Sequence, residues 1–462
     1  MTDTVAATAA AVAAGQTTAR ATTEASLAAI AEADGELNAF SVVLRDQARA
    51  EADARDEQQR RGDALGPLHG VPVAVKEELD VAGCVTTFGG RGNSTPVAAD
   101  GEVVRRLRAA GAVVVGKTRM PEFGAWPYTE SAAYGATRNP WDPTRTPGGS
   151  SGGTAVAVAS GMVPIGMGGD GGGSIRVPSA MCGLFGLKPQ RGRVTTAPHP
   201  HLWWSLGVVG PLTRTVLDSA IVHDVVDGSL DGDRWRAGEI GSLVAAARRE
   251  PGRLRIGWSV KPAAPGVRPD PRHVAAVEQT ARLLVEMGHD VVEVDPRYPD
   301  QTLAFVPQFF AGIRTEADEV EHHRRLERRT RTTYRLGGWV TDGVIERALA
   351  ATERVSAKAN RVFDRVDVLL TPTTAHRPPE VGVLDGVGPV GAALRSMPAI
   401  AYAALWNVAG NPAAAVPRGV ADDGLPLSVQ LVAPTDGEEV LISLAAQLEA
   451  ADPWPQTATK VG

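Results

Sequence analysis

Three short stretches decide how this chain is interpreted: GVPVAVKE at residues 70–77, PGGSSGG at residues 147–153 and GGGSIR at residues 171–176. The first is an apolar run that closes on a lysine, and the other two are glycine-rich turns that each present a serine. Apolar segments interrupt the glycines of residues 139–192, so their density indicates tight turns and close backbone approach. We therefore interpret this region as ordered core and not as a flexible linker.

Ser174, Ser150 and Lys76 have the properties that an acyl-transfer site needs. A serine hydroxyl is a weak nucleophile that requires a base. Burial at the end of an apolar strand favours the neutral form of a lysine, which can then accept a proton. A second hydroxyl both donates and accepts, so Ser150 can pass that proton. The glycines before Ser174 leave backbone N–H groups directed toward one point, as an oxyanion hole requires.

Each motif taken alone also has a plain structural interpretation. Ser174 and Ser150 are both compatible with structural turns, and Lys76 is compatible with an ion pair to Glu77 or Glu78 at a strand end. Only six of the 47 basic residues are lysines, and lysine at position 76 favours a role for an amine that can lose its proton. The three motifs in this order are far more specific than any one of them.

Units of helix, glycine and strand recur along the chain. Residues 102–116 and 273–294 each show apolar residues at helical spacing, then a glycine, then an apolar run that predicts a strand. Residues 20–62 are rich in Ala, Glu and Arg and are predicted to be helical. Further predicted strands are residues 70–75, 367–370 and 428–432. The repetition predicts α/β layers around a central sheet, with residues 228–253 as a loose connection.

Composition excludes several classes of protein. With 462 residues, 43% hydrophobic and 22% charged, the chain has the composition of a large globular protein. The net charge is −6, and the densest basic run, residues 324–331, is interrupted by Glu327 and is interpreted as a solvated helix face. We therefore expect no nucleic-acid partner. No run of 18 strongly apolar residues predicts a membrane span.

The cysteines and the N-terminus favour the cytoplasm. Cys84 and Cys182 form no CxxC pair, so they are interpreted as free core thiols and not as a disulfide or a metal site. The first residues carry an acid, and the alanine run that follows lacks the apolar strength of a signal peptide.

Three familiar patterns occur in the wrong context. Residues 111–118 (GAVVVGKT) satisfy the P-loop pattern, but their variable positions predict a strand where that loop needs exposed amides. The glycines of residues 166–171 satisfy GxGxxG without the required strand–helix pair. Residues 148–152 satisfy GxSxG, yet the proline-rich residues 139–147 before them cannot form the central strand of a nucleophile elbow.

The chain resembles the amidase signature family of serine hydrolases from about residue 20 to about residue 450. The segments that carry the resemblance are residues 68–77, the strand before Lys117 and Thr118, and residues 147–189, with weaker support from 207–213 and 407–417. The resemblance implies one α/β/α sandwich domain, residues 1–462, around a large central mixed β-sheet. Its parts are a helical region of about 1–62, a signature core of about 66–220, and a C-terminal part of about 253–455 that completes sheet and pocket.

The resemblance implies a role for each member of the candidate triad. Ser174 is expected to be the acyl-forming nucleophile and Lys76 the terminal base and acid. Ser150 is expected to bridge them, held by a cis peptide bond to the glycine before it. The backbone amides expected to form the oxyanion hole are those of Gly171, Gly172, Gly173 and Ser174.

Supporting residues follow from the same resemblance. Ser151 is expected to support Lys76 by a hydrogen bond, and Asp170 and Arg176 to brace the glycine loop. Residues around Gly124, between Pro121 and Trp126, are expected to line the acyl pocket. Family members usually carry Thr or Ser where this chain has Gly169 and Gly171, so we expect a more mobile loop or a roomier pocket here. Apolar candidates for the pocket wall are Trp126, Trp203, Trp204, Phe305, Phe309 and Phe310.

The implied function is hydrolysis of carboxylic amide C–N bonds through an acyl-enzyme, with no metal or organic cofactor. We favour broad activity on apolar or aryl amides, extending to esters and carbamates in the manner of a urethanase. One alternative is a hydrolase of cyclic amides or nylon oligomers, and another is a catalytically silent scaffold of this fold. The expected partner is a small-molecule amide, without nucleic acid or membrane, for a monomer or homodimer. Residues 194–204 are unlike the pattern of the tRNA amidotransferase subunit of this family, which disfavours that role.

Overall fold

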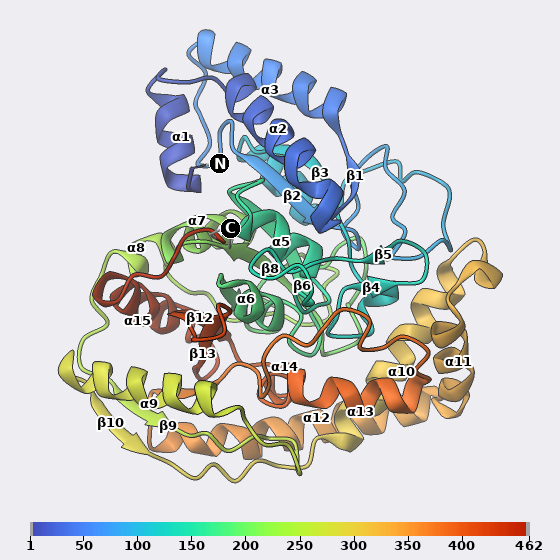
Figure 1. Ribbon diagram of the computed structural model, residues 1–462, viewed down its shortest axis with the longest axis vertical. Coiled ribbons are helices and arrows are strands. Elements are labelled where there is room, and N and C mark those ends of the chain that lie inside the picture. Colours follow the sequence, from blue (N-terminus) through green and yellow to red (C-terminus); the bar gives the residue numbers. More distant parts are fainter. Residues whose placement is uncertain (1–2, 459–462) are drawn as a thin grey trace.

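A mixed β-sheet runs through the protein, and helices cover both of its faces (Figure 1). The computed structural model describes residues 3–458, and within them the main sheet has eleven strands in the order β1-β3-β2-β6-β8-β7-β12-β13-β11-β9-β10. These are β1 Phe40–Val43, β2 Pro72–Lys76, β3 Val113–Thr118, β6 Ile165–Asp170, β7 Phe185–Lys188, β8 Val208–Thr213, β9 Arg255–Trp258, β10 Asp290–Glu293, β11 Val368–Pro372, β12 Ala413–Val420 and β13 Pro426–Val432. Strands β4 Glu130–Ser131 and β5 Gly135–Ala136 form a separate pair.

The described residues 3–458 also form fifteen α-helices. They are α1 Val5–Ala13, α2 Ala19–Leu37, α3 Arg45–Arg60, α4 Glu102–Ala109, α5 Gly152–Ala159, α6 Arg176–Cys182, α7 Val216–Val226, α8 Leu243–Ala247, α9 Pro271–Glu286, α10 Thr302–Glu319, α11 Arg328–Leu336, α12 Asp342–Ala359, α13 Pro389–Ile400, α14 Ala404–Ala409 and α15 Glu438–Ala451. The helix–glycine–strand units α4–β3 and α9–β10 are confirmed. None of the helices in residues 3–458 is both long and apolar enough to cross a membrane.

The prediction of one helical region over residues 20–62 is wrong in its middle. Asn38 ends α2 in the left-handed conformation (φ 53°, ψ 47°), which asparagine tolerates better than most residues. The next residues, Phe40–Val43, include one aromatic and two β-branched side chains and pair with β3 at the edge of the sheet. A partner strand that lies far away in the sequence therefore converts this segment from helix to strand.

Both faces of the N-terminal half of the sheet are buried. Along β2, Val73 and Val75 pack in a cluster with α4 and α7, whereas Ala74 between them packs toward α2 and α5. This alternation follows from the two-residue period of a strand. A strand covered on both faces is apolar throughout, which explains the continuous run before Lys76.

The C-terminal half repeats this arrangement with other helices. Leu370 and Leu431 pack in a cluster with α9 and α15, and Leu369 and Val432 pack in another with α10, α12 and α14. In Figure 1 helices α1–α3 (blue) lie at one end of the molecule, while α10–α13 (yellow to orange) lie at the other. The architecture is thus the expected α/β/α sandwich with a mixed central sheet.

The order of the central strands determines where functional side chains meet. Strands β2 and β6 are parallel neighbours, so their carboxyl ends lie at the same edge of the sheet. Lys76 is the last residue of β2, and Asp170 is the last residue of β6. The loop that precedes α5 and the loop between β6 and α6 carry the two candidate serines to this edge.

The seating of α5 against β3 yields a stability prediction. A Cβ atom at Gly153 would lie 2.5 Å from the carbonyl oxygen of Ala39 and 2.6 Å from the backbone N and O of Arg119. We expect Gly153→Ala to lower the free energy of unfolding by about 1–3 kcal/mol, since backbone atoms must move. As the control, Gly35→Ala in α2, where no atom lies within 4 Å, is expected to raise it by about 0.5–1 kcal/mol. Urea denaturation measures both, and equal effects would contradict the argument.

Candidate active site

The amine of Lys76 lies in hydrogen-bond contact with Ser150. Nζ donates to Ser150 Oγ at 2.8 Å and approaches the carbonyl oxygen of Gly169 at 3.5 Å. Lys76 and Ser150 are 1% and 2% exposed, so the contact is shielded from bulk solvent. The peptide bond between Gly149 and Ser150 is cis. Two residues that lie 74 positions apart in the sequence are therefore directly in contact.

Ser174 lies on the same cavity. The loop between β6 and α6 carries it, and it lines the cavity together with Lys76 and Ser150. The two serine loops are also tied by their backbones, because the amide of Ser151 donates to the carbonyl oxygen of Ser174 at 3.3 Å. The structure thus brings all three predicted residues to one wall.

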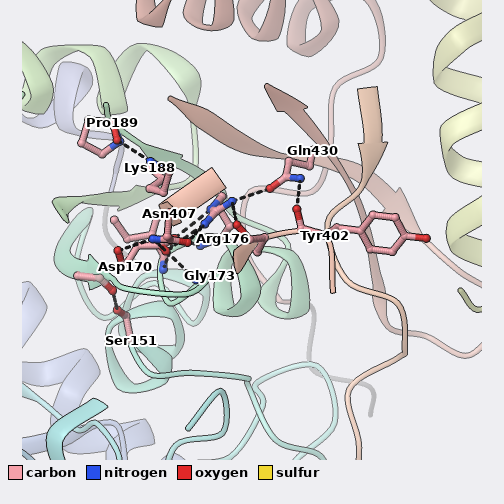
Figure 2. Close-up of polar contacts among 12 residues, drawn as sticks. Ser151, Asp170, Gly173, Arg176, Lys188, Pro189, Tyr402, Asn407 and Gln430 are labelled. Atoms are coloured by element: carbon pink, nitrogen blue, oxygen red, sulfur yellow. Dashed lines mark hydrogen bonds and ion pairs between the residues drawn. The ribbon is translucent and has the colours of Figure 1, made fainter. Parts of the chain in front are cut away.

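A buried ion pair anchors the glycine loop, as Figure 2 shows. The Asp170 carboxylate lies 3.0 Å from the Arg176 guanidinium, and both side chains are fully buried. Its oxygens also accept from the amides of Gly173 at 2.7 Å and Ile175 at 3.1 Å. Asn407 donates to both the carboxylate and the carbonyl oxygen of Asp170 at 2.8 Å. The loop is therefore held to the end of β6 and to α14.

The charges around this pair favour an ionised carboxylate. Burial opposes ionisation of Asp170, but the charge and hydrogen bonds of Arg176 outweigh it and hold the pKa of Asp170 well below its usual range. Lys188, buried close by, donates to the carbonyl oxygen of Pro189 at 2.8 Å. Its own burial, and then the charge of Arg176, lower the pKa of Lys188 to about 7. The Asp170 anchor is therefore charged throughout the physiological pH range.

Arg176 connects the loop to the far half of the sheet. Its guanidinium donates to Gln430 Oε1 at 2.8 Å, and the Gln430 amide donates to the carbonyl oxygen of Tyr402 at 2.9 Å. Arg176 also donates to Asn407 Oδ1 at 2.6 Å. Segments of both halves of the chain converge on this guanidinium (Figure 2).

The backbone amides of the glycine loop are not all available. The amide of Gly173 donates to Asp170 Oδ1 at 2.7 Å. Within residues 3–458, no hydrogen bond uses the amides of Gly171, Gly172 or Ser174. Three of the four predicted donors thus have no acceptor among the described residues, and all three residues line the cavity.

Ser151 contacts the lysine indirectly. Its Oγ donates to the carbonyl oxygen of Gly169 at 3.1 Å, and Lys76 Nζ approaches the same oxygen. Ser151 thus meets Lys76 at a shared acceptor, and the support of Lys76 that we expected from it stays a prediction.

The cavity has a volume of about 630 Å³ and mostly apolar walls. Gly124 lines it, as expected, and so do Trp126 and Trp203. The aromatic residues of α10 that face it are Phe305, Phe309 and Phe310. Glu78 and Glu316 are the acidic side chains near the lysine.

The placement of Trp204 in the pocket wall is wrong. Its ring stacks on His201 with centroids 4.6 Å apart, and Arg234 lies 5.3 Å over it. Trp203 and Trp204 both have left-handed backbone (φ 48° and 58°), and this tight turn directs the neighbouring side chains to different surroundings.

Comparison with known proteins identifies the family of this chain. The sequence profile described as Amidase matches residues 21–442. The chain belongs to the amidase signature family. It is 48% identical to the Mycobacterium tuberculosis protein AmiB2, whose name assigns it provisionally to the amidases, over 91% of this chain and 90% of that protein.

Solved structures of the family have the same fold as this amidase-family hydrolase. A 6-aminohexanoate cyclic dimer hydrolase is 31% identical, with a TM-score of 0.92 over 98% of this chain and 97% of that chain. A bacterial aryl acylamidase of the amidase signature family is 26% identical, with a TM-score of 0.87 over 98% of this chain and 96% of that chain.

Two carboxyl groups of this amidase escaped the sequence analysis as site residues. Glu78 Oε1 lies 3.1 Å from Lys76 Nζ, so the lysine pairs with Glu78, whereas Glu77 accepts from Thr87. Glu316, on α10, accepts from Trp203 Nε1 at 2.9 Å. Glu78 was one of two candidate partners in the sequence, but no motif marks Glu316 in its amphipathic helix.

The buried anchor of this amidase leads to a second stability prediction. Asp170→Asn removes one charge of a fully buried pair, so we expect a loss of about 3–5 kcal/mol in the free energy of unfolding. Asp367→Asn, which breaks the exposed pair with Arg255, is the control and is expected to cost about 1 kcal/mol or less. Urea denaturation of both variants tests this, and a loss for Asp170→Asn no larger than the control would refute it.

Proposed function

We propose that this amidase hydrolyses carboxylic amides through an acyl-enzyme on Ser174, with Ser150 as proton relay and Lys76 as terminal base and acid. The observation that carries the proposal is the 2.8 Å contact between Lys76 Nζ and Ser150 Oγ, at a cavity that Ser174 also lines. A hydroxyl held by a buried amine can pass a proton onward, and a serine nucleophile requires such a base.

Acylation proceeds in two stages, and in each a proton passes through Ser150. The neutral Lys76 amine takes the proton of Ser150 as Ser150 takes that of Ser174, and Ser174 Oγ attacks the carbonyl carbon. The resulting Lys76 ammonium then returns a proton through Ser150 to the leaving nitrogen as the C–N bond breaks. In deacylation a water molecule attacks the carbonyl carbon of the acyl-enzyme. Its proton passes through Ser150 to Lys76 and returns to Ser174 Oγ as the ester bond breaks, so the carboxylic acid is released and Ser174 is restored.

The oxyanion of the tetrahedral intermediate requires fixed donors. The amides of Gly171, Gly172 and Ser174 are proposed for this role, since the Gly173 amide is engaged by Asp170. Donors fixed in advance stabilise developing charge without a cost for reorganisation at the moment of reaction. The Asp170–Arg176 pair contributes by holding the loop that carries them.

The shape and chemistry of the cavity favour apolar or aryl amides. Aromatic side chains contribute to its mostly apolar wall, and exposed Leu336, Val390 and Leu394 continue this apolar surface outward. Apolar pockets of this kind take ligands mainly by burial of apolar area. Activated esters and aryl carbamates present a similar carbonyl group and are included in the proposal.

Cyclic amides and nylon oligomers are the second candidate class. The observation that favours them is the TM-score of 0.92 to a 6-aminohexanoate cyclic dimer hydrolase over 98% of this chain. Hydrolysis of acetanilide, hexanamide, a nylon dimer and an aryl carbamate in one panel separates the two classes.

The first catalytic prediction concerns the nucleophile. We expect Ser174→Ala to lower kcat on the best amide of the panel by about 10⁴-fold or more, because no acyl-enzyme can form. Mass spectrometry of the parent should detect acylated Ser174. Ser160→Ala removes a hydroxyl that bonds only within α5, so it should leave kcat unchanged. Full activity of Ser174→Ala would show that the assigned mechanism is wrong, and an inactive parent would favour a silent scaffold.

The second catalytic prediction concerns the lysine. Lys76→Met should lower amide hydrolysis by about 10²–10⁴-fold, because the leaving amine needs a proton. Hydrolysis of an activated ester should fall less, since a phenolate leaves without one. Lys117→Met is the matched control, because Lys117 is equally buried at the end of neighbouring β3 but bonds to Thr86. Equal losses on amide and ester would exclude the acid role of Lys76.

A further inference from the structure

We propose that Glu78 is a positioning residue for Lys76, and that position 169 is a glycine because only a residue without a side chain leaves room for the Glu78 carboxylate. The inference rests on the proposed function, since it concerns the base of that reaction. Glu78 would hold the amine against Ser150.

Three oxygen atoms surround the amine of Lys76. Lys76 Nζ has Ser150 Oγ at 2.8 Å, Glu78 Oε1 at 3.1 Å and the carbonyl oxygen of Gly169 at 3.5 Å. The amine donates hydrogen bonds to Ser150 Oγ and the Gly169 carbonyl oxygen, and Glu78 Oε1 contacts it as an ion-pair partner. The side chains of Lys76 and Glu78 are 2% and 13% exposed, which places the pair where screening by water is weak.

The Glu78 carboxylate fills the space that a side chain at position 169 would need. A Cβ atom at position 169 would lie 2.0 Å from Glu78 Oε1, closer than non-bonded atoms approach. Gly169 is the fifth residue of β6, and its φ does not lie in the left-handed region, so backbone conformation does not demand a glycine. The space beside Gly169 is therefore occupied by the carboxylate and not added to the pocket. The Glu78 carboxylate can occupy its observed position only because residue 169 has no Cβ atom.

The other charged groups near the amine are neutralised or paired. On α10, Glu316 is bonded to Trp203, and burial followed by the charge of Glu78 raises the pKa of Glu316 well above its usual range, which favours the uncharged acid. On β6, Asp170 is engaged by Arg176. Asp300 also lines the cavity but is exposed, and Tyr298 is a neutral phenol whose pKa is raised by burial.

One carboxylate charge beside one amine has a definite consequence. The negative charge of Glu78 favours the ammonium form of Lys76, and the amine must lose that proton to solvent before it can act as a base. Removal of the charge should make the neutral amine available at lower pH. A purely structural role of Glu78 would lower activity or stability without this shift.

The test measures the proton on Lys76 directly. The chain has only six lysines, so selective isotope labelling of lysine side chains gives few NMR signals, and Lys76→Met identifies the one of interest. We expect the Lys76 signal to titrate at lower pH in Glu78→Gln than in the parent, because the neighbouring negative charge is removed. The acidic limb of the kcat/KM profile on an amide should move by the same amount. Glu77→Gln, whose parent carboxylate bonds to Thr87, is the matched control and should leave both unchanged.

A second variant tests the role of the glycine. In Gly169→Ala the new methyl group should displace the flexible end of Glu78, and the Lys76 midpoint should fall as in Glu78→Gln. The double variant Gly169→Ala/Glu78→Gln should then show no further change. Additive shifts, or a midpoint in folded Gly169→Ala equal to that of the parent, would refute the coupling.

The NMR readout separates the two proposals. An unchanged Lys76 midpoint in Glu78→Gln overturns the role of Glu78, whatever the activity. An inactive parent overturns the proposed function, while a lowered midpoint in the variant would still support the pairing of Glu78 with Lys76.

Discussion

The buried contact between Asp170 and Arg176 is the interaction on which the rest of the site depends. Both charges are withdrawn from water, which is tolerated only because each is fully hydrogen-bonded. The carboxylate accepts hydrogen bonds from amides of the glycine loop. The guanidinium donates hydrogen bonds to Asn407 and Gln430. This one pair therefore fixes the loop that carries Ser174 and joins it to α14 and β13. Loss of either charge would release both the loop and the contact between the two halves of the sheet.

The parallel pairing of β2 and β6 supplies the second constraint. Because the two strands end at the same edge, Lys76 and the glycine loop meet there although they lie far apart in the sequence. Helix α5, seated closely on β3 through Gly153, brings Ser150 to the same point. Helix α10, from the C-terminal half, closes the cavity with aromatic side chains. The proposed reactive groups thus come from the signature core, and much of the cavity wall comes from outside it.

Much of the fold was predictable because its elements are long and regular. The apolar runs of β2, β3 and β11 and the helix–glycine–strand units follow from periodicity, which depends on local sequence alone. The prediction failed where a distant partner decides the outcome, as at Phe40–Val43, which becomes a strand by pairing with β3. The placement of Trp204 failed for a related reason, since a turn with left-handed backbone separates it from Trp203. Such turns have no periodic signature in the sequence.

By itself, the sequence determined the family and the candidate reactive groups. Two serines among glycines and one lysine after a buried run, in this order, admit few chemistries, because each motif needs side chains and backbone freedom that few residues provide. Only the tertiary structure decided which charges surround them. Glu78 and not Glu77 faces Lys76, and Glu316 reaches the same cavity from α10. Electrostatic surroundings depend on distances in space across several elements, and those distances are not encoded at any local spacing in the chain.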